Sequence, residues 1–155
     1  MLNWFECKIK YEKTAEEGKI VKVCEAYLVD ALSFTEAEAR IMEEMKPFIS
    51  GEFIVSNVRR ARINEMFANA NGDKWYRSKV YFVSLDEEKG IEKRTPCTMF
   101  VQADTVKEAW DGLTEGMKGT MAEYEIAAIT ETNILDVYPF KAVEETEKGG
   151  TDEQK

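Results

Sequence analysis

The stretch YLVDALSFTEAEARIMEEMKP, residues 27–47, predicts a strand that leads directly into an amphipathic helix. Ser33 is a typical N-cap residue, and Glu36 three positions later completes a capping box, in which the carboxylate reaches back to the cap. Pro47 cannot continue a helix, so the helix ends before it. Apolar residues at spacings of three, four and four form one buried helical face. They are Phe34, Ala37, Ile41 and Met45.

Residues 99–119, MFVQADTVKEAWDGLTEGMKG, repeat this pattern further along the chain. Thr105 and Glu108 correspond to the cap and the capping carboxylate, and Gly119 occupies the place of Pro47. The equivalent apolar stripe is Val106, Ala109, Leu113 and Met117.

The correspondence extends over residues 3–67 and 74–138, mostly at an offset of 71. One extra residue in the second copy is placed near Pro96, where it predicts an edge strand or a bulge. Because a fixed self-similarity reports a repeated structural unit, we interpret the chain as an internal duplication. Matched pairs include Trp4 with Trp75, Phe5 with Tyr76, Lys8 with Lys79, Val29 with Val101 and Phe67 with Tyr138.

Each copy is predicted to be a ββαβ unit, which makes the fold class α+β. Alternation of apolar and polar residues predicts the strands. We expect two mainly antiparallel three-stranded sheets, each with one helix, related by a pseudo-two-fold axis. The sheets either join edge to edge into one or pack through their faces. The first copy comprises strands 3–13 and 19–31, a helix at 34–46, and either one strand over 52–67 or two pieces with a kink near 59–62. The second comprises strands 75–85 and 91–103, a helix at 105–118, and a last strand within 123–138.

The predicted domain boundaries follow from this duplication. The first repeat spans 1–67, a polar linker with a glycine spans 68–73, and the second repeat spans 74–140. Residues 141–155 have almost nothing apolar to bury and predict a disordered acidic tail.

The composition is that of a cytoplasmic globular protein of 155 residues with 44% apolar and 33% charged residues. The net charge of −9 makes nucleic acid an unfavourable partner unless positive charge gathers locally. No apolar run is long enough to cross a membrane, and no secretory leader is expected.

The sequence lacks residues and motifs on which several kinds of catalytic and binding site usually depend. The chain has no histidine, which removes the commonest general base and zinc ligand, and it has no glycine-rich phosphate loop. We therefore expect a non-enzymatic protein without cofactor or metal. Glu43 and Glu44, or the acidic run 86–88, are candidate metal or acid–base groups, and the alternative that we favour is a solvated helix face and a solvated turn. The three cysteines are unpatterned, although Cys7 and Cys24 could face each other across the first hairpin and form a disulfide.

The main functional lead is a difference between the copies. Residues 59–62 read RRAR, whereas the aligned residues 130–133 read TETN. Arginine suits bidentate recognition of phosphate or carboxylate, and nearby aromatic side chains could sandwich a base. If this segment is a strand, Arg60 and Arg62 point to the same face. The alternative is that these arginines pair with some of the 30 acidic residues. The candidate ligand-binding residues are Arg59, Arg60, Arg62, Tyr76, Arg77 and Lys79.

NWFECKIKYEKT at the start, then YLVDALSFTEAEARIMEEM, PFISGEF, KWY and EGMKGTMAEY resemble a family of unknown function. That family occurs in Bacteroides-type gut bacteria and in their mobile elements and phages. The resemblance covers about residues 1–140 and implies a small, cytosolic, single-domain protein. It implies no catalytic residues.

Four functions follow as hypotheses. The first is a non-enzymatic binding or adaptor protein with a protein partner, for which the resemblance implies a mobile element or phage as one source. The second is a small-molecule binder that sequesters a nucleotide-like anion through the arginines. The third is single-stranded nucleic-acid binding, and the fourth is an acidic mimic of nucleic acid. The oligomeric state stays open.

Overall fold

The computed structural model describes residues 3–140 and divides into two compact units. Unit 1 contains residues 3–61 together with residues 136–140, and unit 2 contains residues 62–135. The boundaries of these units differ from those of the sequence repeats. Residues 62–67, which end the first repeat, belong to unit 2, and residues 136–140, which end the second repeat, belong to unit 1. The predicted acidic tail lies outside the described residues.

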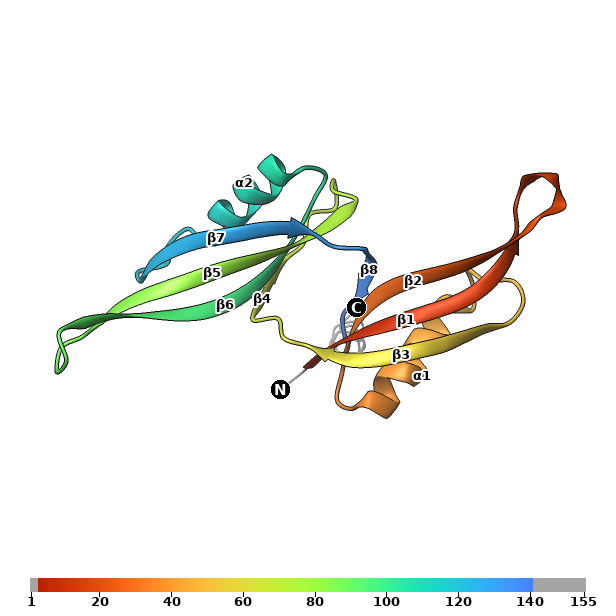
Figure 1. The fold of residues 1–155 in the computed structure, drawn as a ribbon, viewed down its shortest axis with the longest axis horizontal. Helices are drawn as coiled ribbons and strands as arrows, with labels where there is room; N and C mark the ends of the chain where they lie inside the picture. The colour runs from red at the N-terminus through yellow and green to blue at the C-terminus, as the bar shows by residue number, and fades with distance from the viewer. Residues whose placement is uncertain (1–2, 141–155) are drawn as a thin grey trace, which may run out of the picture. The chain divides into compact units, whose positions relative to one another are not determined.

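Unit 1 is a four-stranded sheet with one helix on one face (Figure 1). The strand order is β3-β1-β2-β8, and β1 pairs antiparallel with both β2 and β3. A short 3-10 turn, η1 (Glu16–Gly18), joins β1 to β2. The elements are β1 (Asn3–Thr14), β2 (Ile20–Ala31), α1 (Phe34–Met45), β3 (Phe53–Ala61) and β8 (Ile134–Tyr138).

Unit 2 has the same kind of architecture, with strand order β4-β6-β5-β7. β5 pairs antiparallel with β6 and β7, whereas the short β4 runs parallel to β6. The elements are β4 (Glu65–Phe67), β5 (Lys74–Asp86), β6 (Ile91–Ala103), α2 (Val106–Gly116) and β7 (Glu123–Glu131).

The prediction of three-stranded sheets is therefore wrong by one strand in each unit. The segment 52–67 forms two strands that lie in different sheets, and the segment 123–138 does the same. A strand of three residues such as β4 is too short to carry a periodic pattern, so the alternation could not reveal its separate pairing.

The two hairpins share one pairing register. Cys7 pairs with Tyr27 in unit 1, and Ser78 pairs with Met99 in unit 2. The β5–β6 ladder runs without a shift, so the expected bulge at Pro96 is wrong, and the extra residue lies in the hairpin turn instead. The edge position is confirmed, because β4 pairs only with residues 99–101 of β6 and leaves Pro96 at an open edge.

The buried helical stripes are confirmed in their main part. Ala37, Ile41 and Met45 of α1 are buried, and so are the matching residues Ala109, Leu113 and Met117 at α2. Phe34 and Val106 are exceptions, since each is more than half exposed. Both occupy the first helical turn, and the Phe34 ring packs edge-on against Phe5 of β1 while its other side stays exposed.

The caps form as predicted, with one difference. The Ser33 hydroxyl accepts a hydrogen bond from the Glu36 N–H at 3.1 Å, and Thr105 caps α2 in the same way. The glutamate carboxylates, however, accept from the residue before the cap, Leu32 or Asp104, so the reciprocal bond begins one residue earlier than expected.

The cysteines cannot form the disulfide that the sequence allowed. Cys7 pairs with Tyr27 and faces the buried core, whereas Cys24 pairs with Lys10 and lies exposed on the opposite face of the sheet. All three cysteines are free. Burial, with a smaller contribution from Glu6, raises the pKa of the Cys7 thiol to about 12, so this side chain stays neutral in the core.

No helix among the described residues is long and apolar enough to cross a membrane.

Candidate functional site

The three predicted arginines do not share a strand face. β3 ends at Ala61, so Arg62 lies beyond the strand and belongs to unit 2. Arg59 pairs with Glu6, and Arg60 pairs with Phe5, which places the two side chains on opposite faces of the unit 1 sheet. The expectation that Arg60 and Arg62 point the same way from one strand is therefore wrong.

Arg59 and Arg60 have partners within unit 1. The Arg59 guanidinium contacts Glu6 Oε1 through Nη2 at 2.7 Å and through Nε at 3.2 Å. Glu6 is only 6% exposed, so this contact neutralises a carboxylate that would otherwise be buried without a counter-charge. Arg60 Nη2 donates to Asn3 Oδ1 at 2.8 Å. For Arg59 this is the ion-pair alternative anticipated from the sequence.

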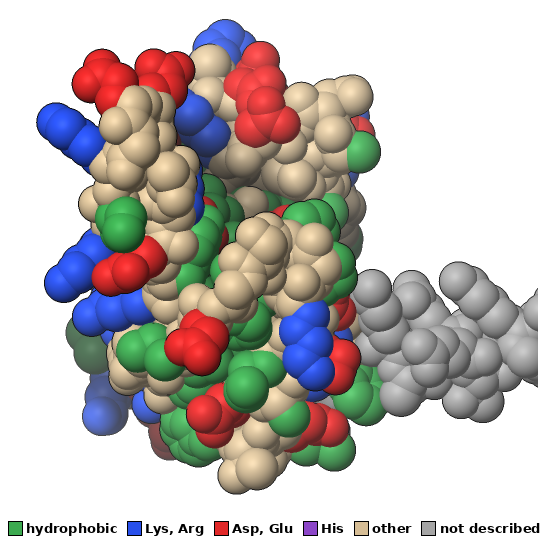
Figure 2. All heavy atoms as spheres, turned by 90° about the vertical axis from the view of Figure 1, so that its right-hand side faces the viewer, with side chains coloured by type: hydrophobic (Ala, Val, Ile, Leu, Met, Phe, Trp, Pro, Cys, Tyr) green, Lys and Arg blue, Asp and Glu red, His purple; other side chains and the backbone are tan. Residues whose placement is uncertain are grey.

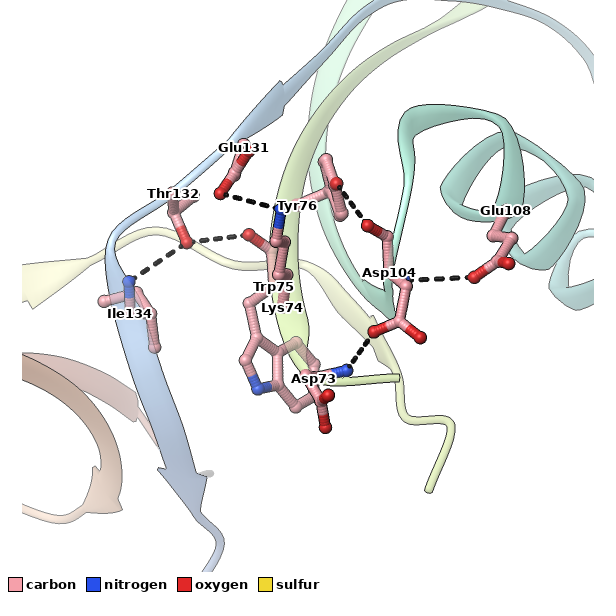
Figure 3. Close-up of polar contacts among 9 residues, drawn as sticks. All are labelled: Asp73, Lys74, Trp75, Tyr76, Asp104, Glu108, Glu131, Thr132 and Ile134. Atoms are coloured by element: carbon pink, nitrogen blue, oxygen red, sulfur yellow. Dashed lines mark hydrogen bonds and ion pairs between the residues drawn. The ribbon is translucent and has the colours of Figure 1, made fainter. Parts of the chain in front are cut away.

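Tyr76 belongs to the core of unit 2 and offers no ring face to a ligand. It is 2% exposed, and its hydroxyl donates to the Asp104 carbonyl at 3.3 Å (Figure 3). Asp104 also accepts from the Asp73 N–H at 2.7 Å and donates its own N–H to Glu108 at 3.1 Å. This network fixes the start of β5 against the start of α2.

The segment TETN has a structural use of its own, which Figure 3 also shows. The Thr132 hydroxyl donates to the Trp75 carbonyl at 2.8 Å and accepts from the Ile134 N–H at 3.3 Å. Glu131 lies 3.6 Å from Lys74. The difference between RRAR and TETN therefore reflects different side-chain contacts at the ends of the two strands. It does not by itself identify a binding site.

Arg77 and Lys79 lie together on the face of the unit 2 sheet opposite α2. They alternate along β5 with the core residues Tyr76, Ser78 and Val80, so their side chains point away from the core. Tyr81 follows on the same face, and cross-strand pairing adds residues of β6 to it. We call this surface the basic aromatic face. Its members are Arg77, Lys79, Tyr81, Arg94 and Phe100.

The cations of the basic aromatic face lie over aromatic rings. The Arg94 guanidinium is 4.4 Å from the Tyr81 ring centre, and Lys79 Nζ approaches the same ring at 5.8 Å. Arg77 lies 5.4 Å from the ring centre of Phe100. Arg94 also pairs with Glu125 at 2.6 Å, with both side chains about half exposed. Sequence reasoning found Arg77 and Lys79 but missed the other three, although the hairpin register combined with alternation would have found them.

The corresponding face of the unit 1 sheet is hollowed near its hairpin. A groove of about 380 Å³ is lined there by residues that include Lys10, Lys22, Cys24 and the exposed Ile54. In the space-filling view of Figure 2, lysine and arginine side chains are most numerous on the left, with acidic side chains among them.

The acidic residues considered as metal or acid–base groups have ordinary roles. Glu43 pairs with Lys46 at 3.3 Å on the exposed face of α1. The Asp86 carboxylate accepts from the N–H groups of Glu88 and Lys89 and so closes the second hairpin. Within residues 3–140 no group of three or more His, Cys, Asp or Glu side chains is placed to hold a metal ion.

Asp30 is a buried carboxyl group that has an effect on stability. Its Oδ1 atom has no hydrogen-bond partner among the described residues. Burial raises its pKa above the ordinary value, and Arg40 and the Phe140 N–H offset this only in part. In unit 2 the matching position is Gln102, whose Oε1 accepts from the Asn69 N–H at 2.8 Å. In each unit this side chain therefore holds the segment that follows the short strand, β8 or β4, against the sheet.

Asp30→Asn is expected to raise the free energy of unfolding at pH 7. A raised folded-state pKa means that the stability due to this group is fully present below about pH 3.8 and is lost as the pH rises through the folded-state value. The variant should therefore gain most over the wild type near pH 7, and the gain should shrink toward pH 4. Urea unfolding at both pH values measures this, with Glu87→Gln in the exposed second hairpin as control. An equal gain at both values would contradict it.

The sequence of residues 3–140 matches the profile of a family described as a domain of unknown function (DUF4494). Searches of curated proteins and of solved structures find no match.

Proposed function

Since the chain belongs to the DUF4494 family, whose function is unknown, we propose a function from the geometry: the protein is a non-enzymatic binding protein that holds a nucleotide-like anion on its basic aromatic face. The observation that carries this proposal is the cluster at Tyr81, whose ring has Arg94 at 4.4 Å and Lys79 at 5.8 Å. Two cations thus lie beside one partly exposed aromatic ring.

The chemistry of the face suits a ligand that combines phosphate with a planar base. Arginine donates two parallel hydrogen bonds to a phosphate, and its guanidinium plane also stacks on aromatic rings. Arg77 and Lys79 are exposed, so their charges are accessible to an incoming anion. The net charge of −9 repels anions at a distance, which favours a small ligand recognised by close contacts over a long polyanion.

Single-stranded nucleic acid is the second candidate, because successive bases stack on aromatic side chains beside cations in proteins that bind it. Tyr81, with Arg94 over its ring, supports this alternative at one position, because Phe100 is only 2% exposed and its ring is closed to a base.

We also infer that the two halves arose by internal duplication. The equal hairpin registers support it, and so do the pairing shifts at Lys8/Ile9 and Lys79/Val80, which fall at matching positions. A pseudo-two-fold relation stays part of this proposal. So do a cytoplasmic location, which the composition favours, and an origin in gut Bacteroides or their mobile elements, which the sequence motifs favour.

Titration of the protein with mononucleotides, short single-stranded oligonucleotides and acidic peptides tests the proposal by calorimetry. Arg94→Ala combined with Lys79→Ala is expected to weaken nucleotide binding by at least about tenfold, as cation–π and phosphate contacts are lost. Lys107→Ala combined with Lys118→Ala, which removes two exposed cations at and just after α2, is the matched control and should leave affinity unchanged.

The outcomes separate the candidates. Binding only of oligonucleotides, with a steep salt dependence, would favour the second candidate. Binding of acidic peptides alone would point to a protein partner. Equal losses in the two double variants would show that only net charge matters, and the basic aromatic face would then have no specific role.

A further inference from the structure

The cores of the two units are filled differently at matching positions. In unit 1 the Glu25 carboxylate accepts from the Tyr11 hydroxyl at 3.0 Å and from the Tyr27 hydroxyl at 2.9 Å. The Tyr27 ring also packs on Tyr138, with 6.0 Å between ring centres. These side chains fill the space beneath the end of α1.

In unit 2 smaller or apolar groups replace that network. The shared register places Phe82 where unit 1 has Tyr11, Cys97 where it has Glu25, and Met99 where it has Tyr27. Phe82, Cys97 and Met99 carry no hydroxyl or carboxylate, so they cannot form the tyrosine–glutamate hydrogen bonds of unit 1, and the space is left partly open.

The turn that follows each helix increases this difference between the two cores. The Phe48 N–H donates to the Met45 carbonyl at 2.9 Å, and the Thr120 N–H donates to the Met117 carbonyl at 3.1 Å, so the two turns correspond. The next residue in unit 1 is Ile49, which is buried in the core. Its counterpart Met121 is 97% exposed and leaves the space unfilled.

The space is a pocket of about 280 Å³ within unit 2 that opens to solvent, and we call it the unit 2 cavity. Gly116 lets the Phe67 ring pack against α2 at its edge, because a Cβ there would come within 2.6 Å of that ring. Methionine side chains adapt to irregular ligands, which suits them to this lining. The apolar lining consists of Phe67, Phe82, Cys97, Met99 and Met117.

The polar part of the cavity carries one negative charge. Asn64, Glu65 and Thr120 complete the lining, and Glu65 is the only charged residue among them. The Asn64 side chain is occupied, since its Oδ1 accepts from the Thr98 N–H at 2.9 Å. Burial, with the neighbouring Glu65 carboxylate, raises the pKa of the Cys97 thiol and keeps it neutral. A ligand there would contact an apolar lining and a single carboxylate.

We propose that this cavity is a binding site for a small apolar amine, whose ring or chain lies between Phe67, Met99 and Met117 and whose ammonium group contacts Glu65. The site is separate from the basic aromatic face, which lies on the other side of the sheet and carries the opposite charge. It follows from the difference between the two cores and does not depend on the proposed function.

Titration of the full chain, labelled with ¹³C at its methionine methyls, with 2-phenylethylamine tests the site. The Met99 and Met117 methyl signals should shift saturably, whereas Met45, which holds the matching place in the filled core of unit 1, should not shift. 2-Phenylethanol, which has the same body without the charge, should bind more weakly. Glu65→Gln should abolish this preference for the amine.

Cys97→Phe, which fills the cavity, should weaken amine binding by at least about tenfold, while Cys24→Phe on the exposed face of unit 1 should not. A second readout needs no variant: the amine should slow alkylation of Cys97 and leave Cys24 unaffected. The absence of a saturable shift at Met99 and Met117 up to about 10 mM would overturn the site. Equal affinity for amine and alcohol would overturn the assigned ligand class.

Discussion

A chain that ends at residue 135 is expected to lose much of the stability of unit 1, although most of unit 1 is formed by residues 3–61. The removed residues include most of β8, which lies beside β2 in that sheet. Tyr138 packs on Tyr27, and Arg40 donates to the Pro139 carbonyl at 2.9 Å. Losing a half-buried aromatic side chain, this hydrogen bond and the pairing of β8 with β2 should reduce the free energy of unfolding of unit 1 by about 3 kcal/mol or more.

Amide hydrogen exchange measures this effect for each unit separately. Protection should fall across β1 and β2 and stay near the wild-type level across β5 and β6, whose unit retains all of residues 62–135. A chain that ends at residue 140 keeps every described contact and serves as control. Uniform loss of protection in both units, or no loss in unit 1, would show that the assignment of residues 136–140 to unit 1 is wrong.

Local sequence signals predicted the parts of the fold that local physics decides. The stripe containing Ile41, the cap at Ser33 and the alternation along β1 all report interactions between near neighbours in the chain. The pairing partner of β4 is different in kind. It depends on which sheet has an unpaired edge next to residues 65–67. A segment of three residues is too short for its pattern of apolar and polar residues to show that pairing.

The candidate site was predicted only in part for a similar reason. Arginines are conspicuous in an acidic sequence, but the role of Arg59 is set by Glu6 on the neighbouring strand, which spacing in the sequence does not show. The position of Tyr76 could have been inferred, since it matches Phe5, and alternation places that residue in the core. Cross-strand neighbours such as Tyr81 and Arg94 became visible only with the register.

Gly72→Ala is expected to be among the most damaging single substitutions in unit 2. Gly72 lies in the predicted linker 68–73, yet it does not adopt the left-handed conformation that favours glycine. It is required because of close packing. A Cβ at this position would lie 2.6 Å from the Ala103 Cα and 2.7 Å from the Ala103 nitrogen, which are backbone atoms of β6 and cannot move aside as a side chain can.

The expected loss is about 2–4 kcal/mol in the free energy of unfolding, because relieving the overlap requires the segment to separate from β6. That separation would also strain the hydrogen bond from Gln102 Nε2 to the Gly72 carbonyl, which measures 3.0 Å. Urea unfolding of Gly72→Ala beside the neighbouring Asn71→Ala tests this, since the exposed Asn71 should tolerate the change within about 0.5 kcal/mol. If both variants were equally stable, the linker 68–73 would be able to move away from β6, and the close approach of residue 72 to β6 would not constrain unit 2.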